Sequence, residues 1–215
     1  MNIHHLTVGP LRVNCFLLVD VKNDEGWLID PGGNVSDIMH LLETTGARPT
    51  RIINTHAHFD HVLAVPDIKN KTDATFHLHR DEQPVLDYTP VAVKTWLGWE
   101  WGPPPAVDSY LAHGDKLTLG DDSLEIRHVP GHSPGSIIFV DHSGRRAWVG
   151  DTVFRESVGR TDLPGGSHSQ LIRAINEQIF TLPDDYTLFP GHGPFTTVGH
   201  ERRHNPFAAP NLWVD

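Results

Sequence analysis

Four potential metal ligands lie within one short stretch of the chain, Thr55-His56-Ala57-His58-Phe59-Asp60-His61. Imidazole nitrogens and carboxylate oxygens are the ligands that divalent transition metals take where thiolates are absent. His56 and His58 are two residues apart, so they would project to the same side of an extended loop. Asp60 and His61 would start the next helix and reach a neighbouring position. Because a single ion could not readily use all four groups, the spacing indicates two adjacent metal ions.

Three more histidine or aspartate residues share the context of that stretch. Each follows a strand-like run and is flanked by glycine or proline, which predicts a loop at a strand end. Glycine there permits the tight backbone geometry that a close approach to an ion requires. These residues are His132 in Pro130-Gly131-His132-Ser133-Pro134-Gly135, Asp151 in Val149-Gly150-Asp151-Thr152 and His192 in Pro190-Gly191-His192-Gly193. Together with the first cluster, they favour a metal site over a set of structural histidines.

Strand-like and helix-like runs interleave along the chain, which predicts a mixed α/β fold with sheets covered by helices. A helix is predicted to begin after Asn34, as its N-cap, and to end at Gly46. After residue 90 the pattern breaks into an aromatic, proline-rich insertion near 90–106. Strands are predicted at 15–19, 27–29, 51–54, 75–78, 123–129, 135–140, 145–149 and 186–189, and further helices at 60–70, from Leu171 to Ile179 and at the C-terminal end.

The composition is that of an ordinary globular domain, with 215 residues, 38% of them hydrophobic and 20% charged. The net charge of −10 argues against a nucleic-acid partner, because no excess of cations is available to neutralise phosphates. The single cysteine, Cys15, excludes an internal disulfide framework and is expected to be a small buried hydrophobe. No apolar run approaches the roughly 18 residues of a membrane span, and no signal peptide is recognisable, so a cytoplasmic protein without a membrane partner is expected.

The order of the ligands resembles that of the metallo-β-lactamase superfamily of hydrolases, over nearly the whole chain. Four stretches look like those of the short, single-domain bacterial type II glyoxalases, which are hydroxyacylglutathione hydrolases: Gly131-His132-Ser133-Pro134-Gly135, Gly159-Arg160-Thr161-Asp162, Pro190-Gly191-His192-Gly193-Pro194 and Glu201-Arg202-Arg203-His204-Asn205-Pro206-Phe207. The resemblance implies an αββα sandwich, with residues 1–215 as a single metallo-β-lactamase-like domain. The separate C-terminal helical domain with which longer glyoxalases contact glutathione is expected to be absent.

The resemblance also implies how the ligands are shared between two ions. The first ion would be held by His56, His58 and His132, the second by Asp60, His61 and His192, with Asp151 and a water or hydroxide bridging the two. Two cations lower the pKa of the shared water and polarise a substrate carbonyl, while the catalytic candidates Asp60 and Asp151 offset part of the positive charge. The expected cofactor is therefore two divalent ions per chain, zinc in the first place, with iron and manganese accepted by the same donors.

The implied reaction is hydrolysis of a thioester such as S-D-lactoylglutathione to glutathione and a hydroxy acid, by attack of a metal-bound hydroxide. The substrate would be a small, glutathione-linked molecule. The main alternative is an iron-dependent persulfide dioxygenase acting on glutathione persulfide, a family similar in ligand order and in the stretch 159–162, in which His56, His132 and Asp151 would hold one iron. A lactonase and a metal-binding module without catalysis are further alternatives. The oligomeric state is left open.

Two groups of residues near the ligands have alternative roles. Arg160 and Asp162 either line the substrate entrance, where Arg160 would pair with a substrate carboxylate, or form an internal ion pair. Trp99, together with Trp96 and Trp101, either forms a wall of the substrate pocket or anchors the insertion or an oligomer contact.

Four other residues are candidates for supporting roles. Thr55 and Asp30 lie next to predicted strand ends and are expected to orient ligands through hydrogen bonds. Glu201 and His204 would lie on a terminal helix, where packing or capping is favoured over such an orienting role.

Overall fold

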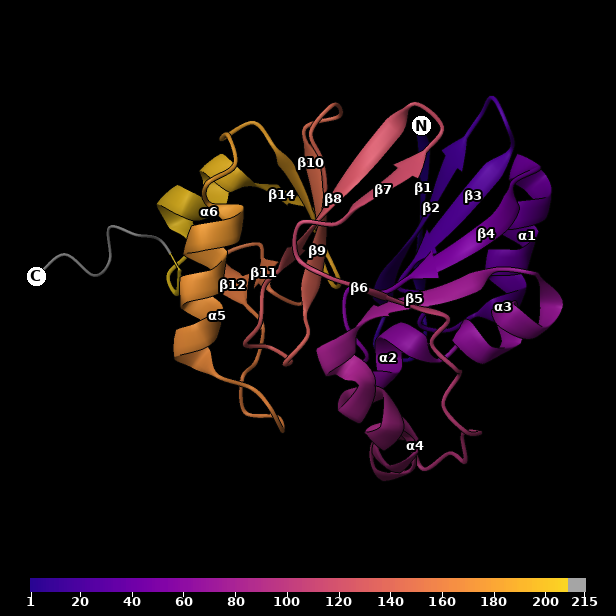
Figure 1. The fold of residues 1–215 in the computed structure, drawn as a ribbon. Helices are drawn as coiled ribbons and strands as arrows, with labels where there is room; N and C mark the ends of the chain where they lie inside the picture. The colour runs from indigo at the N-terminus through magenta and orange to yellow at the C-terminus, as the bar shows by residue number, and fades with distance from the viewer. Residues whose placement is uncertain (209–215) are drawn as a thin grey trace, which may run out of the picture. The chain divides into compact units, whose positions relative to one another are not determined.

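The computed structural model of the protein describes residues 1–208. The chain divides into two units, the first formed by Met1–Leu111 with Thr118–Asp122, the second by Ala112–Leu117 with the residues from Ser123 onward. Figure 1 shows the elements of both units in chain order, from indigo to yellow. The first unit contains one six-stranded sheet, and the second is built around another.

The sheet of the first unit has the strand order β1-β2-β3-β4-β5-β6. The first three strands are antiparallel to one another, whereas β3, β4, β5 and β6 run parallel. Parallel neighbours need crossover connections, and helices supply them. The strands are β1 Asn2–Val8, β2 Val13–Asp20, β3 Glu25–Ile29, β4 Arg48–Ile53, β5 Thr75–His79 and β6 Ser109–Leu111. The crossover elements are α1 Val35–Thr45, α2 Phe59–Val62, α3 Val65–Lys71, the short 3-10 helix Arg80–Glu82 and α4 Gln83–Leu97.

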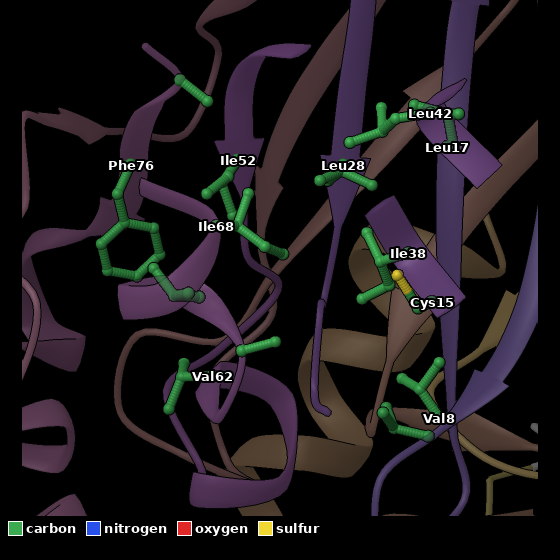
Figure 2. Close-up of a cluster of buried hydrophobic side chains, with 14 of the residues drawn as sticks. Val8, Cys15, Leu17, Leu28, Ile38, Leu42, Ile52, Val62, Ile68 and Phe76 are labelled. Atoms are coloured by element: carbon green, nitrogen blue, oxygen red, sulfur yellow. The ribbon is translucent and has the colours of Figure 1, made fainter. Parts of the chain in front are cut away.

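One face of this sheet packs against the crossover helices, and α1 and α3 lie side by side along it (Figure 1). Figure 2 shows the resulting core, in which Leu28 and Ile52 of the sheet meet Ile38 of α1 and Ile68 of α3. Trp27, which points to the other face, is buried as well. Burial on both faces explains why these strands appear in the sequence as nearly continuous apolar runs.

The predicted helix after residue 34 is confirmed as α1, although Asn34 does not cap it with its side chain. Asn34 occupies the N-cap position in a left-handed conformation, with φ 48°, and its Oδ1 accepts from the backbone N–H of Gly9 instead. Its Nδ2 donates to Asp37 in the first turn. The side chain therefore ties the β1–β2 turn to the helix start. Gly46 ends the helix with φ 69°, as predicted.

The prediction that the pattern breaks after residue 90 is wrong for the first part of that segment. Helix α4 continues to Leu97 and includes Pro90, so Trp96 lies on its last turn. Its buried positions are Leu86, Thr89 and Val93, a narrow stripe that contains only two apolar residues. This stripe and the internal proline hide the helical period from a reading of the sequence.

The second sheet, which belongs to the second unit except for residues of β7 and β8 within Thr118–Asp122, has the order β14-β13-β10-β9-β8-β7. Strands β8, β9 and β10 form an antiparallel meander, and β13 then returns parallel to β10. The bounds are β7 Lys116–Leu119, β8 Asp122–His128, β9 Ile137–Asp141, β10 Arg146–Gly150, β13 Thr187–Pro190 and β14 Thr196–Thr197, with the small hairpin β11 Val153–Phe154 and β12 Ser157–Val158. The helices are α5 His168–Ala174, its π-helical continuation Ile175–Ile179, and α6 Val198–His204.

The core of the second unit lies between this sheet and its helices. Val140 and Val149 of the meander pack in one buried cluster with Leu171 of α5 and Ile175 of the π-helical turn. The predicted strands of this half and the predicted helix around Leu171 are confirmed, and so is the mixed α/β class. Within residues 1–208, no helix combines the length and the apolar character needed to cross a membrane.

Candidate metal centre

The first unit brings together the four potential ligands of the stretch after β4. The ring centroids of His56 and His58 are 4.8 Å apart, and those of His56 and His61 are 4.1 Å apart. The carboxylate Oδ2 of Asp60 lies 3.6 Å from Nε2 of His61. His56, Asp60 and His61 are all buried. The sequence prediction that these side chains converge is thus met within this unit.

Asp30, at the end of β3, organises two of these histidines. Its carboxylate accepts from the backbone N–H of Thr55 at 2.8 Å, from the Thr55 hydroxyl at 2.6 Å and from Nδ1 of His61 at 3.0 Å. Since the hydroxyl hydrogen of Thr55 goes to Asp30, Thr55 Oγ1 accepts from Nδ1 of His56, which is 3.1 Å away. Both rings therefore carry their hydrogen on Nδ1 and present the lone pair of Nε2. The predicted orienting role of Thr55 and Asp30 agrees with these contacts.

The separation of His61 from Asp60 fits a shared cation. Nε2 of His61 and the Asp60 carboxylate each offer a lone pair, and 3.6 Å is too long for a hydrogen bond between them. Two ligands that each lie about 2.1 Å from one ion, at an angle of about 120°, would be about 3.6 Å apart. The donor set and its spacing are therefore those of a divalent metal site.

The backbone of the β3–α1 turn approaches the ligand loop so closely that it requires glycine. A Cβ at Gly32 would lie 1.7 Å from the carbonyl oxygen of Asp60. On the other side of the loop, the Asn54 amide donates to the carbonyl of His61 at 2.8 Å. These contacts fix the start of α2, which carries Asp60 and His61.

Two further residues hold the ligand loop, and the sequence analysis did not identify them. Glu82 accepts from the backbone N–H of Ala57 at 2.8 Å, and the hydroxyl of Thr89 donates to the Ala57 carbonyl at 3.3 Å. Glu82 follows the end of β5, which is parallel to β4. Because the carboxyl ends of parallel strands lie at one edge of a sheet, its place in the sequence was a usable signal.

The second unit brings together the other three predicted ligands. They follow β8, β10 and β13, and β10 and β13 are parallel neighbours whose carboxyl ends lie at the same edge. Oδ2 of Asp151 lies 3.7 Å from Nε2 of His132 and 3.7 Å from Nε2 of His192. Asp151 thus stands between two histidines, at separations that again suit ligands of shared cations.

The stretch 159–162 supports this second cluster through its backbone. Nδ1 of His132 donates to the carbonyl oxygen of Arg160 at 2.8 Å, so Nε2 again carries the lone pair. A Cβ at Gly159 would lie 1.9 Å from the carbonyl oxygen of Asp151, which explains the glycine. The backbone of the Gly-Arg-Thr-Asp stretch therefore orients His132, independently of the Arg160 and Asp162 side chains.

The side chains of Arg160 and Asp162 form the internal ion pair that was one of their two predicted roles. Nε and Nη2 of Arg160 donate to the two oxygens of Asp162 at 2.7 and 2.8 Å. This pairing lowers the pKa of Asp162 to about 2. Both side chains are at least half exposed, at 50% and 69%. A role in binding substrate stays a prediction for both.

The three tryptophans after residue 95 divide into two kinds. Trp101 packs partly buried against the core of the first unit, and its Nε1 donates to the carbonyl of Leu63 at 3.3 Å. Trp96 and Trp99 are 60% and 52% exposed. Trp101 therefore anchors the segment, whereas a contact of Trp99 with substrate stays a prediction.

Glu201 has a structural role in the second unit. It is fully buried and accepts from the hydroxyl of Thr196 at 2.5 Å, from the backbone of Glu156 at 2.9 Å and from the amide of Asn205 at 2.9 Å. These bonds join α6 to the β11–β12 turn, which agrees with the packing role that was favoured for Glu201.

Cys15 is buried as predicted, and burial raises the pKa of its thiol, which keeps it protonated and unreactive.

Comparison with known proteins adds a family match and relatives of similar length. The family model of the metallo-β-lactamase superfamily matches residues 8–192. A probable metallo-hydrolase, YqgX of Bacillus subtilis, is 35% identical over 209 residues, which cover 96% of this chain and 97% of the relative. The hydroxyacylglutathione hydrolase GloC of Haemophilus influenzae is 32% identical over 213 residues, covering 96% and 98% of the two chains.

Solved structures are similar over almost the whole chain. The B3 metallo-β-lactamase BLEG-1 has a TM-score of 0.89 at 32% identity and covers 99% of this chain and 100% of its own. TTHA1623, solved in a di-iron-bound form, has a TM-score of 0.87 at 38% identity, with 95% and 99% covered. ETHE1 from Myxococcus xanthus has a TM-score of 0.79 at 26% identity, with 97% and 85% covered.

Proposed function

Because the chain belongs to the metallo-β-lactamase superfamily and shares its fold, as its ligand order predicted, we propose that its two ligand clusters act together as one dinuclear metal centre. In this proposal each cluster contributes to both ions. The first ion is held by His56, His58 and His132, the second by Asp60, His61 and His192, and Asp151 bridges them. The ligand separations of 3.6 and 3.7 Å inside each unit support this assignment.

The chain's own residues prepare these groups for metal binding. Asp30, directly and through Thr55, keeps His61 and His56 in the tautomer whose Nε2 carries the lone pair. The carbonyl of Arg160 does the same for His132. Asp60 and Asp151 supply negative charge against the two cations. When bound, two such ions supply a hydroxide nucleophile near neutral pH and an electrophile that stabilises the oxyanion formed by attack on a carbonyl.

We propose that the substrate is a glutathione thioester, which the enzyme hydrolyses to glutathione and a hydroxy acid. The observation that carries this choice is the similarity to GloC, a hydroxyacylglutathione hydrolase, over 96% of this chain and 98% of that one. Trp99 is exposed and is proposed to contact the substrate. Arg160 and Asp162 are proposed to lie at the substrate entrance, where a substrate carboxylate would compete with Asp162 for the guanidinium.

The second candidate is the iron-dependent persulfide dioxygenase, with a mononuclear iron on His56, His132 and Asp151. TTHA1623, at 38% identity, was solved with two iron ions, which favours iron as the metal but agrees with a dinuclear site rather than a mononuclear one. Zinc, iron and manganese all suit a nitrogen and oxygen donor set, so the reaction has to be tested with each metal.

The experiment that tests the proposal is turnover of S-D-lactoylglutathione by protein of measured metal content, with oxygen uptake followed in parallel. Loss of the thioester without oxygen uptake, in proportion to the content of two metal ions per chain, is expected. Protein with both sites filled by zinc, iron or manganese that leaves the thioester intact would contradict the hydrolase. Oxygen uptake with glutathione persulfide, by protein loaded with iron, would then support the dioxygenase.

A further inference from the structure

Ala57, the residue between His56 and His58, is held at both of its backbone polar groups. Its N–H donates to Oε2 of Glu82 at 2.8 Å, and its carbonyl lies 3.3 Å from Oγ1 of Thr89, whose single hydrogen it shares with the carbonyl of Val85 at 3.2 Å. All three residues are buried, with relative exposures of 0% for Ala57 and Glu82 and 1% for Thr89. We call these two hydrogen bonds the Ala57 clamp. It joins the ligand loop to the segment that begins after β5.

The clamp acts on the two peptide planes that set the geometry of the neighbouring histidines. The Ala57 N–H lies in the plane that follows His56, and its carbonyl lies in the plane that precedes His58. The angle between these planes depends on φ and ψ of Ala57 alone, since the peptide bonds themselves are planar. Glu82 holds the first plane and Thr89 the second. The clamp therefore constrains the backbone between two rings whose centroids are 4.8 Å apart.

The loop has no regular secondary structure that could do the same work. Residues 54–58 lie between β4 and α2, so the backbone of Ala57 belongs to neither element. A buried N–H group needs a hydrogen-bond partner, and a carboxylate is a stronger acceptor than a neutral group. The acceptor here comes from Glu82, 25 residues along the chain. Asp60 and His61 do not contact the clamp through any of these bonds and are held by Gly32, by the Asn54 amide and by Asp30, of which Asp30 also reaches His56 through Thr55.

We propose that Glu82 and Thr89 are positioning residues for the metal ion assigned to His56 and His58. The proposal rests on the ligand assignment of the proposed function. It adds that the clamp serves only one of the two ions, whereas Asp30 serves both. Loss of the clamp therefore weakens the ion on His56 and His58 and spares the ion on Asp60 and His61.

The test is metal binding by the whole chain, without substrate. Metal-free wild type and variants are titrated with Zn²⁺ against a chromophoric chelator, and the Co²⁺-loaded proteins are compared by absorption spectroscopy. For Glu82→Ala, one of two ions is expected to bind about 10- to 100-fold more weakly, with an altered Co²⁺ spectrum. Glu82→Gln keeps an acceptor oxygen, so it is expected to restore most of that affinity and the spectrum.

Thr89 supplies a second, milder pair of variants. Thr89→Val removes the hydroxyl at nearly constant volume and is expected to weaken the same ion, whereas Thr89→Ser keeps the hydroxyl and is expected to bind like the wild type. If Glu82→Ala does not fold, the comparison of Thr89→Val with Thr89→Ser tests the clamp in its place. Glu201→Gln is the control, because it alters another fully buried carboxylate that holds a backbone N–H, and its hydrogen bonds go to Glu156, Thr196 and Asn205, none of which is a proposed ligand. It is expected to leave both ions bound as in the wild type.

Each result separates the clamp from the proposed function. Unchanged affinity for both ions and an unchanged Co²⁺ spectrum in Glu82→Ala, or in Thr89→Val where the first does not fold, would overturn the clamp. Equal weakening in Glu201→Gln would also overturn it, because the effect would then be general destabilisation. Wild type that binds two ions but leaves thioesters intact would overturn the proposed substrate and leave the clamp standing. Wild type that binds no metal would overturn both.

Discussion

Asp30 and His61 form a buried hydrogen bond of 3.0 Å between the carboxylate Oδ2 and the ring Nδ1. The two residues are 31 positions apart, at the ends of two separate segments of the chain. The same carboxylate oxygen also takes the hydrogen of the Thr55 hydroxyl, which in turn accepts from His56. One aspartate thus determines which nitrogen is presented by two of the proposed ligands.

The first prediction concerns Asp30. Asn tolerates the left-handed backbone of this position, where φ is 49°, so Asp30→Asn keeps the fold of the turn. The new side-chain amide donates a hydrogen bond, but the Thr55 hydroxyl and Nδ1 of His61 beside it also need to donate. Because His61 and His56 would then be poorly oriented, metal affinity is expected to fall by about 10- to 100-fold. Chelator competition measures the loss. Thr55→Val removes the hydroxyl that connects Asp30 to His56 but leaves the bond from Asp30 to His61, so its metal affinity is expected to fall less. Equal affinity in Asp30→Asn and wild type would contradict this role.

The second prediction concerns the proposed bridging ligand. Asp151→Ala removes the carboxylate that lies 3.7 Å from both His132 and His192. Metal content and thioester hydrolysis are expected to fall together. Elemental analysis of the purified variant, beside its turnover rate, measures both. A variant that retains two ions per chain would count against the dinuclear assignment.

The third prediction concerns the tryptophans, which form a matched pair. Trp99→Ala is expected to raise KM for the thioester and to leave metal content and unfolding free energy unchanged, because Trp99 is half exposed. Trp101→Ala is expected to cost about 2 kcal/mol of unfolding free energy, because it leaves a gap beside the core and removes the bond to Leu63. Urea unfolding and steady-state kinetics of both variants test this division. Identical kinetics for Trp99→Ala and the wild type would remove Trp99 from the substrate contacts.

The fourth prediction concerns stability in acid. Burial, followed by the nearby charge of Arg51, lowers the pKa of His77 from 6.5 to about 4. In the unfolded chain His77 takes up a proton below about pH 6.5, whereas in the folded chain it stays neutral down to about pH 4. The unfolded state therefore binds more protons in this window, and stability falls as the pH drops from 6.5 towards 4, by up to about 1.4 kcal/mol per pH unit from this group.

His77→Gln is expected to flatten that dependence. Urea unfolding between pH 4.5 and 7.5, with a chelator present so that metal release does not contribute, measures the slope. Gln can still bond to the Thr75 hydroxyl, which lies 2.7 Å from Nε2 of His77. An equal slope in variant and wild type would assign the acid sensitivity to other groups.

The local parts of the fold could be predicted because they depend on neighbours in the sequence. The strands 15–19 and 27–29 and the helix that ends at Gly46 follow from apolar period and turn residues, and the structure confirms them as β2, β3 and α1. Helix α4 was not predicted, because Pro90 and a stripe of only two apolar residues conceal its period. Asn34 is the N-cap residue as predicted, but its side chain accepts from Gly9 of another turn and does not cap the helix.

The sequence by itself determined the superfamily, the seven candidate ligands and their places at strand ends, because ligand chemistry and strand–loop patterning are both local properties. Only the tertiary structure decided what surrounds those ligands. Glu82, Thr89 and the Arg160 carbonyl meet the ligand loops from 25 or more residues away. Such partners are brought together by strand order and backbone path. The place of Glu82 after β5 marks it only once the order of the parallel strands is known, and a backbone carbonyl such as that of Arg160 carries no mark of this role in the sequence.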